Sequence, residues 1–144
     1  MAPRASAFLT RLRTECVDDL ACSGRGIWRI TEPFQYYSAL LGIVITIEPG
    51  FLTDYASVPR VPFAYWLFGD TSHEAAVLHD WLFHHHGVCS EAMANKVLLE
   101  AMVVEGIPAW RRAGIYAGVV LGGKSSWEED GAGDGHSIVA GHIV

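Results

Sequence analysis

The sequence has few charged residues, and basic ones are in the minority. Charged residues make up 18% of the 144, and 10 Lys and Arg against 16 Asp and Glu give a net charge of −6. Proteins that bind the phosphate backbone of nucleic acids present a broad basic surface. This composition therefore predicts that nucleic acid is not a partner.

Cysteine is also scarce. Cys16, Cys22 and Cys89 are odd in number and include no Cys-x-x-Cys spacing. Domains held together by disulfides carry an even and denser set of cysteines. A disulfide framework is therefore not expected, and synthesis in a reducing compartment is the simpler interpretation.

Long apolar runs are missing too. No run reaches the roughly 20 residues that a membrane-spanning helix needs. Residues 1–14 carry Arg4, Arg11 and Arg13 between short apolar pieces, which is not the pattern of a secretory signal peptide. We expect no membrane span.

Hydrophobic residues nevertheless make up 51% of the chain, enough for one domain with a real core. Short runs in the first half predict strands at 8–17, 25–31, 34–38 and 43–47, and the last of these is β-branched throughout. Because the connections between them are short, hairpins and an antiparallel sheet are favoured over parallel crossovers.

The hydrophobic period changes in the second half. Helices are predicted from His73 to about His85, from Ser90 as N-cap to Gly106 as terminator, and from Trp110 to about Leu121 after Pro108. The predicted fold class is therefore α+β, with a small antiparallel N-terminal sheet followed by three helices, in a single domain over residues 1–127.

The last segment, residues 128–144, differs from the rest. It begins as an acidic, glycine-rich linker and ends in an apolar, β-branched stretch that includes Ile138, Val139, Ile143 and Val144. Such an end is prone to strand pairing. We expect it to dock on another chain by adding a strand to an exposed sheet edge; the alternative is that it folds back onto its own sheet.

Polar groups are concentrated in the run Gly-Phe-Leu-Thr-Asp-Tyr-Ala-Ser-Val-Pro-Arg at 50–60, and in His73 and the doublet His79-Asp80 that follow it. With Ser90 and residues 100–102, this pattern resembles a phage and prophage family known as domain of unknown function thirteen fifty-three. The resemblance covers roughly residues 25–127 and implies a phage origin without an established activity. The family usually has Asp where this chain has Asn95, an amide that cannot act as a base.

Helical geometry places some of these groups together. His73 and Asp80 are seven residues apart and share a helix face that His84 joins, while His79 points elsewhere. If Asp54 folds onto this face, Asp54, His73 and Asp80 form the ligands of zinc or another divalent metal. The spacing and the His-Asp doublet bear weak similarities to zinc carboxypeptidases that trim peptidoglycan and to His-Asp phosphohydrolases.

Four residues are candidates for a catalytic role: Asp54, Ser57, Arg60 and His79. One arrangement has Ser57 as nucleophile and His79 as base, although no nucleophile elbow supports it. In the structural alternative, Asp54 and Ser57 cap backbone amides of a turn and Arg60 pairs with Asp80. Both interpretations remain open at the level of sequence.

Three functions follow from these features. The first is a virion component, made in the host cytoplasm and located in the tail or tail tip, with other phage structural proteins as partners through the C-terminal tail. The second is a metal-dependent hydrolase acting on cell-wall peptidoglycan. The third is an intracellular phage factor that binds a host protein. Metal content separates the second from the others.

Overall fold

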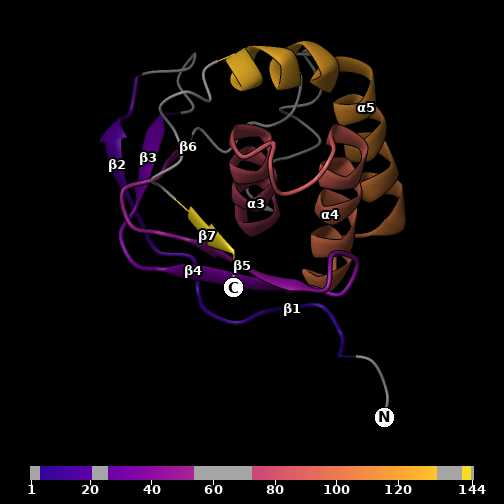
Figure 1. Cartoon of the computed structure of the whole chain (residues 1–144), viewed down its shortest axis with the longest axis horizontal. Helices are drawn as coiled ribbons and strands as arrows, with labels where there is room; N and C mark the ends of the chain where they lie inside the picture. Colours follow the sequence, from indigo (N-terminus) through magenta and orange to yellow (C-terminus); the bar gives the residue numbers. More distant parts are fainter. Residues whose placement is uncertain (1–3, 21–25, 54–72, 133–140, 144) are drawn as a thin grey trace.

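The protein is an α+β domain in which two small antiparallel sheets lie beside three helices (Figure 1). The structure is a computed structural model and describes residues 4–20, 26–53, 73–132 and 141–143. Its elements are β1 (Ala7–Phe8), β2 (Thr14–Asp18), β3 (Ile27–Ile30), β4 (Phe34–Ser38), β5 (Ile43–Ile47), β6 (Leu52–Thr53), α3 (His73–His84), α4 (Glu91–Val104), α5 (Ala109–Ala132) and β7 (Gly141–Ile143). The predicted fold class is confirmed.

The larger sheet has the strand order β1-β4-β5-β7. Its centre is the hairpin of β4 and β5, where Tyr36 lies opposite Ile45 and Phe34 opposite Ile47. These four side chains are fully buried, because alternate residues of a strand point to the same face. That face carries one wall of the hydrophobic core.

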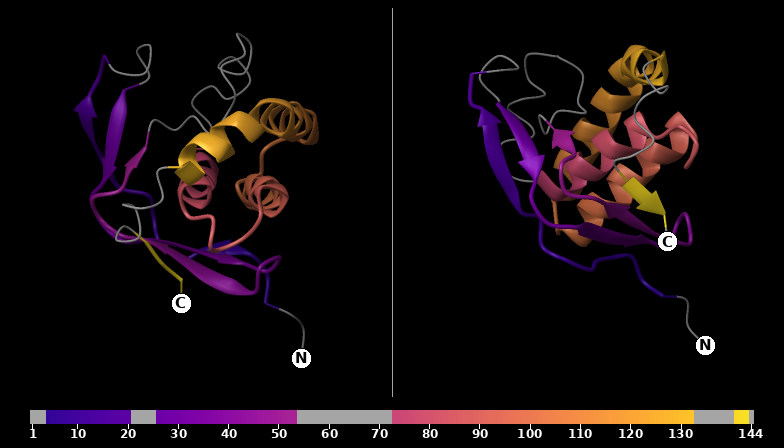
Figure 2. Two further views of the ribbon diagram at one scale, coloured as in Figure 1. Left: turned by 45° about the horizontal axis from the view of Figure 1, so that its top comes forward. Right: turned by 60° about the vertical axis from the view of Figure 1, so that its left-hand side comes forward.

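The smaller sheet has the order β2-β3-β6, and its outer strand β2 stands away from the helices (Figure 2). The sequence predicted one strand over residues 8–17, but the chain forms two, β1 and β2, in different sheets. In β2 every residue after Thr14 is exposed. An ion pair of 2.8 Å between Arg29 and Glu15 links β3 to β2 on this exposed surface.

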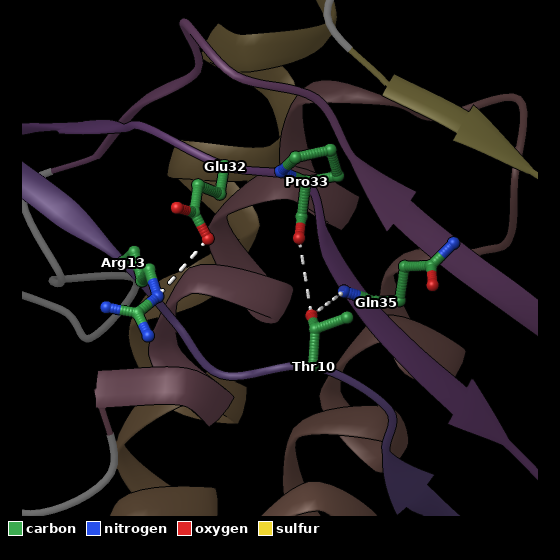
Figure 3. A network of polar contacts seen from close by, with 5 residues as sticks. All are labelled: Thr10, Arg13, Glu32, Pro33 and Gln35. Atoms are coloured by element: carbon green, nitrogen blue, oxygen red, sulfur yellow. Dashed lines mark hydrogen bonds and ion pairs between the residues drawn. The ribbon is translucent and has the colours of Figure 1, made fainter.

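A network of polar contacts ties the β1–β2 connection to the chain before β4 (Figure 3). The Thr10 hydroxyl accepts from the Gln35 backbone N–H at 2.9 Å and donates to the Pro33 carbonyl at 3.3 Å. Arg13 pairs with Glu32 at 3.2 Å. These contacts hold the β1–β2 connection, where the chain passes from the larger to the smaller sheet, against residues 32–35.

The helices begin and end largely where their caps predict. Ser90 has extended backbone angles, and its hydroxyl accepts from the Met93 N–H at 3.2 Å, as an N-cap does. Gly106 ends α4 with a φ of 78°, a conformation that costs glycine little. Within the described residues no helix is long and apolar enough to cross a membrane.

One glutamate of α4 holds the helical layer to the sheet. Glu100 accepts from the Tyr36 hydroxyl and from the Leu40 N–H, each at 2.9 Å. The bond to this carboxylate and burial both raise the pKa of Tyr36, burial being the larger cause. Glu100 therefore fixes α4 across the β4–β5 hairpin.

The end of α5 differs from the prediction. The helix continues past Leu121 to Ala132, so residues 128–132 are helical rather than part of a linker. Its C-terminal part, golden in Figure 1, runs at an angle to its first part. Gly122 and Gly123 stand between the two, and a glycine pair lets a helix bend without ending it.

The C-terminal strand folds back onto its own chain. β7 pairs antiparallel with β5, with Ile143 opposite Ile45 and Gly141 opposite Ile47. We expected this stretch to dock on another chain, whereas the structure has the fold-back alternative at residues 141–143. The physical reason is proximity: the free edge of β5 offers the same backbone pairing that a foreign edge would.

Candidate functional site

The inner side of α3 holds a buried polar pair. His79 is fully buried, and its Nε2 lies 2.7 Å from Oδ1 of Asn95, which is buried on α4. Because an amide oxygen only accepts, Nε2 carries the proton and donates it. The His79 ring also packs on Phe83, with 4.2 Å between ring centroids.

This environment keeps His79 neutral. Burial is the main cause that lowers its pKa to about 4, and it outweighs the opposing effects of the Asn95 bond and of Asp80. A neutral imidazole bonded to an amide joins α3 to α4 without a buried charge. The geometry therefore gives His79 a place in the helix interface and lends no support to its role as a base for Ser57.

The next residue, Asp80, points to the other side of α3. Its carboxylate lies 3.4 Å from Nε2 of His84, one turn later, and the two form an ion pair when His84 is protonated. The side chains are 14% and 36% exposed, so Asp80 is nearly covered while His84 is open to solvent. The predicted common face of Asp80 and His84 is confirmed.

The start of the polar run at 50–60 lies beside the face of α3 that carries Asp80 and His84. Phe51 is buried and packs edge-on against the His84 ring, with centroids 5.9 Å apart. Its carbonyl accepts from Ile30 N–H at 2.9 Å, and β6 pairs with β3 directly after it. Thr53, the last residue of β6, is buried. The chain is thus anchored beside Asp80 and His84 just before Asp54.

Several predicted site residues lie outside the described residues. Asp54, Ser57 and Arg60 are among them, and of His73 only the backbone is described, as the first residue of α3. Their convergence with Asp80 therefore stays a prediction. Within the described part of the chain, no three His, Cys, Asp or Glu side chains gather closely enough to hold a metal.

The three consecutive histidines at the end of α3 do not act as one group. His84 faces Asp80, whereas the ring of His85 stacks on Trp81 with centroids 4.1 Å apart and its Nδ1 lies 2.7 Å from the Trp81 carbonyl. Successive helix residues point about 100° apart. The triplet is a helix end whose members have different neighbours.

A carboxyl group near the start of α3 has an unusual environment. Glu105, the residue that ends α4, accepts from the Ala75 N–H at 2.8 Å and so satisfies one of the free donors of the first turn of α3. Burial, with a smaller contribution from nearby Glu74, raises the pKa of Glu105 to about 7, although the Ala75 bond opposes this. Glu105 is therefore a carboxyl group that titrates near neutrality.

The family model described as protein of unknown function (DUF1353) matches residues 28–119, well over half of the chain. The protein belongs to the DUF1353 family. No curated protein and no solved structure matches it.

The contacts of Asn95 and Glu105 in this DUF1353 domain were hardly predictable from the sequence. For Asn95, a polar residue within the apolar face of a predicted helix does indicate a buried polar partner. Glu105 had no local signal, because its partner Ala75 belongs to another helix. Tertiary packing alone brings them together.

Proposed function

We propose that this DUF1353 protein is a structural component of a phage particle, located in the tail or tail tip. The observation that carries the proposal is the outer side of α5. From Ala109 to Leu121 the exposed residues of this helix are all apolar: Ala109, Trp110, Ala113, Ala117, Val120 and Leu121. A helix that faces only water presents polar side chains outward.

Such a face supports a role that depends on protein–protein contact. Trp110 is 61% exposed and Leu121 is 87% exposed, which costs hydration free energy that a partner would recover. Assembly into a particle supplies partners at high local concentration. The phage resemblance noted for the Gly50–Arg60 run and the His79-Asp80 doublet gives the context of that assembly.

The test is particle composition. Phage carrying the wild-type gene are purified and their proteins identified by mass spectrometry, beside phage carrying the double substitution Val120→Ser and Leu121→Ser. We expect the wild-type protein in the particles and the variant in the lysate only. Leu20→Ser is the control, because Leu20 is 82% exposed outside the helical layer. A wild-type protein found only in the lysate contradicts the proposal and favours an intracellular factor that binds a host protein.

A second candidate function is a metal-dependent hydrolase acting on cell-wall peptidoglycan. The observation in its favour is the Asp80–His84 pair, which combines a carboxylate with a solvent-open imidazole on one helix face. Both groups are ligands that zinc accepts. A divalent metal bound there, with further ligands such as Asp54 and His73, would supply a Lewis acid for attack by water.

This candidate makes a separate prediction. The purified protein would contain about one equivalent of a divalent metal, and Asp80→Asn or His84→Gln would lower that content and the clearing of peptidoglycan suspensions together. Asp19→Asn serves as control, because Asp19 is exposed in the β2–β3 connection. Metal-free protein that remains folded and leaves peptidoglycan intact after incubation with zinc excludes the hydrolase.

A further inference from the structure

The outer side of α5 is unusual in carrying no charge over more than three turns. The exposed positions lie within one broad stripe of the helix, opposite the buried residues Ile115 and Val119. The two arginines of this stretch are held by their own chain: Arg111 lies over the Trp110 ring at 5.4 Å, and Arg112 donates to the Ile107 carbonyl.

The edge of the smaller sheet also exposes an apolar residue, but this edge is protected. The edge strand β2 carries Val17, but Glu15 and Asp18 flank it and the register shifts between Cys16 and Asp18. Charges and bulges of this kind prevent an edge from pairing with another chain. The exposed residues on the outer side of α5 include no charge, so this side favours contact with a partner.

From its shape and charge we infer that this side of α5 binds the same side of a second copy of the chain, in a two-fold symmetric antiparallel helix pair. Large side chains stand at its two ends, Trp110 at one and Leu121 at the other. Between them the exposed residues are Ala113, Ala117 and Val120, and the half-exposed glycines Gly114 and Gly118 each stand next to one of the positions 113 and 117 in the chain. Rotation by 180° about an axis through the middle of this stretch brings Trp110 of each copy over Leu121 of the other.

The small residues in the middle permit the two helix backbones to approach closely, which is what lets the large ends overlap. A symmetric contact also uses one patch twice, so the patch must be complementary to itself. This one is, because it has no charge that a second copy would repel. The chain as a whole has a net charge of −6, which disfavours pairing of two copies through its charged surfaces.

The area of the patch sets the expected affinity. Thirteen helical residues span about 20 Å, so the contact is smaller than the roughly 800 Å² per partner of a standard stable interface. The dimer is therefore weak and depends on concentration, with a dissociation constant of about 10 μM or above. The inference rests on the proposed assembly role and identifies the first partner as another copy.

The experiment is sedimentation velocity of the full chain over about 1 μM to 1 mM. The wild-type protein should shift from monomer to dimer within this range. Ala117→Glu and Ala117→Arg place like charges across the two-fold axis and should each raise the dissociation constant at least about tenfold. Both substitutions keep a good helix former on an exposed position, and circular dichroism checks that the fold is retained.

Mixing the two variants gives the decisive readout. Glutamate and arginine then face each other, and a heterodimer should form where each variant alone is monomeric. Leu20→Glu, an apolar-to-acidic change at an exposed position outside the helical layer, should leave dimerisation unchanged. A wild-type chain that stays monomeric throughout overturns the inference, as does a dimer that survives both charges at Ala117.

The two proposals fail separately. A monomeric protein that is found in particles refutes the α5 pair and leaves the structural role intact, with a different protein on this face. A dimer that never enters particles refutes the structural role and leaves the α5 pair intact.

Discussion

The two sides of α3 differ although the residues that define them are neighbours. His79 is buried, neutral and bonded to Asn95, whereas Asp80 points about 100° away around the helix and forms an ion pair with the half-exposed His84 when His84 is protonated. A His-Asp doublet in a sequence suggests that both residues belong to one site. On this helix its two members belong to different environments: His79 contacts Asn95 of α4, and Asp80 contacts His84 of the same helix. The two residues therefore have different neighbours, and substitutions at each should have effects of different size.

The buried side should respond most strongly. Replacing Asn95 with Ala leaves the His79 Nε2–H without its acceptor in a closed interface and opens a small cavity. We expect the free energy of unfolding to fall by about 3 kcal/mol. Urea denaturation followed by circular dichroism measures this. A loss below about 1 kcal/mol would mean that the buried Asn95 bond contributes no more to stability than a surface ion pair does, which would contradict the proposed difference between His79 and Asp80.

Replacing Asn95 with Asp, the residue that the family resemblance implies at this position, should change the charge of the buried side. In the present chain the His79 pKa is about 4, lower than its ordinary value, so the stability that comes from its neutral form is present above pH 6.5 and lost as the pH falls towards 4. Asn95→Asp puts a carboxylate against the ring and should raise this pKa by about 2 units, which reduces the loss in acid by about 2 kcal/mol.

Nuclear magnetic resonance of the histidine rings measures that titration. His79 of the wild-type protein should remain neutral from pH 5 to 8, whereas in the variant its signals should move with pH in that range. Unchanged His79 shifts in the variant would show that burial alone determines its charge.

A third change concerns the contact between α4 and the start of α3. The pKa of Glu105 is raised to about 7, so its contribution to stability is present below pH 4.5 and is lost as the pH rises through 7. Glu105→Gln keeps an acceptor for the Ala75 N–H but removes the charge. Because Glu105 is partly exposed, the expected gain is modest, about 1 kcal/mol at pH 8 and none at pH 4.5. Thermal unfolding at both pH values tests this, and an equal gain at both would contradict it.

The smallest effect is expected on the open side of α3. Asp80→Ala breaks an ion pair with the half-exposed His84 and should lower the free energy of unfolding by less than about 0.5 kcal/mol. The same urea experiment that measures Asn95→Ala provides the comparison. A loss of several kcal/mol would mean that Asp80 supports the fold, as the structural alternative with Arg60 holds, and would weaken its case as a metal ligand.

Local patterns predicted much of the fold. β5 has the bounds that its β-branched run indicated, α4 begins after the Ser90 cap, and it ends before the glycine at 106. These features depend on residues close together in the chain, and the physical chemistry of strands and caps acts over the same short range. The division of residues 8–17 between two sheets had no such local signal.

The candidate site was predictable only where one helix contains it. The common face of Asp80 and His84 follows from helical geometry, because residues four apart are neighbours on any α-helix. The pairing of His79 with Asn95, and of Glu105 with Ala75, joins residues of different helices. No spacing rule predicts such contacts, because the packing of α3 on α4 decides them.

The sequence by itself determined the α+β class, the family, the positions of the main strands and helices, and the helix face that Asp80 and His84 share. The tertiary structure decided which polar groups are buried, that β7 pairs with β5 of its own chain, and that the outer side of α5 remains uncovered. The physical reason is range: propensity, capping and periodicity act within a few residues, whereas burial depends on every element that packs against a side chain.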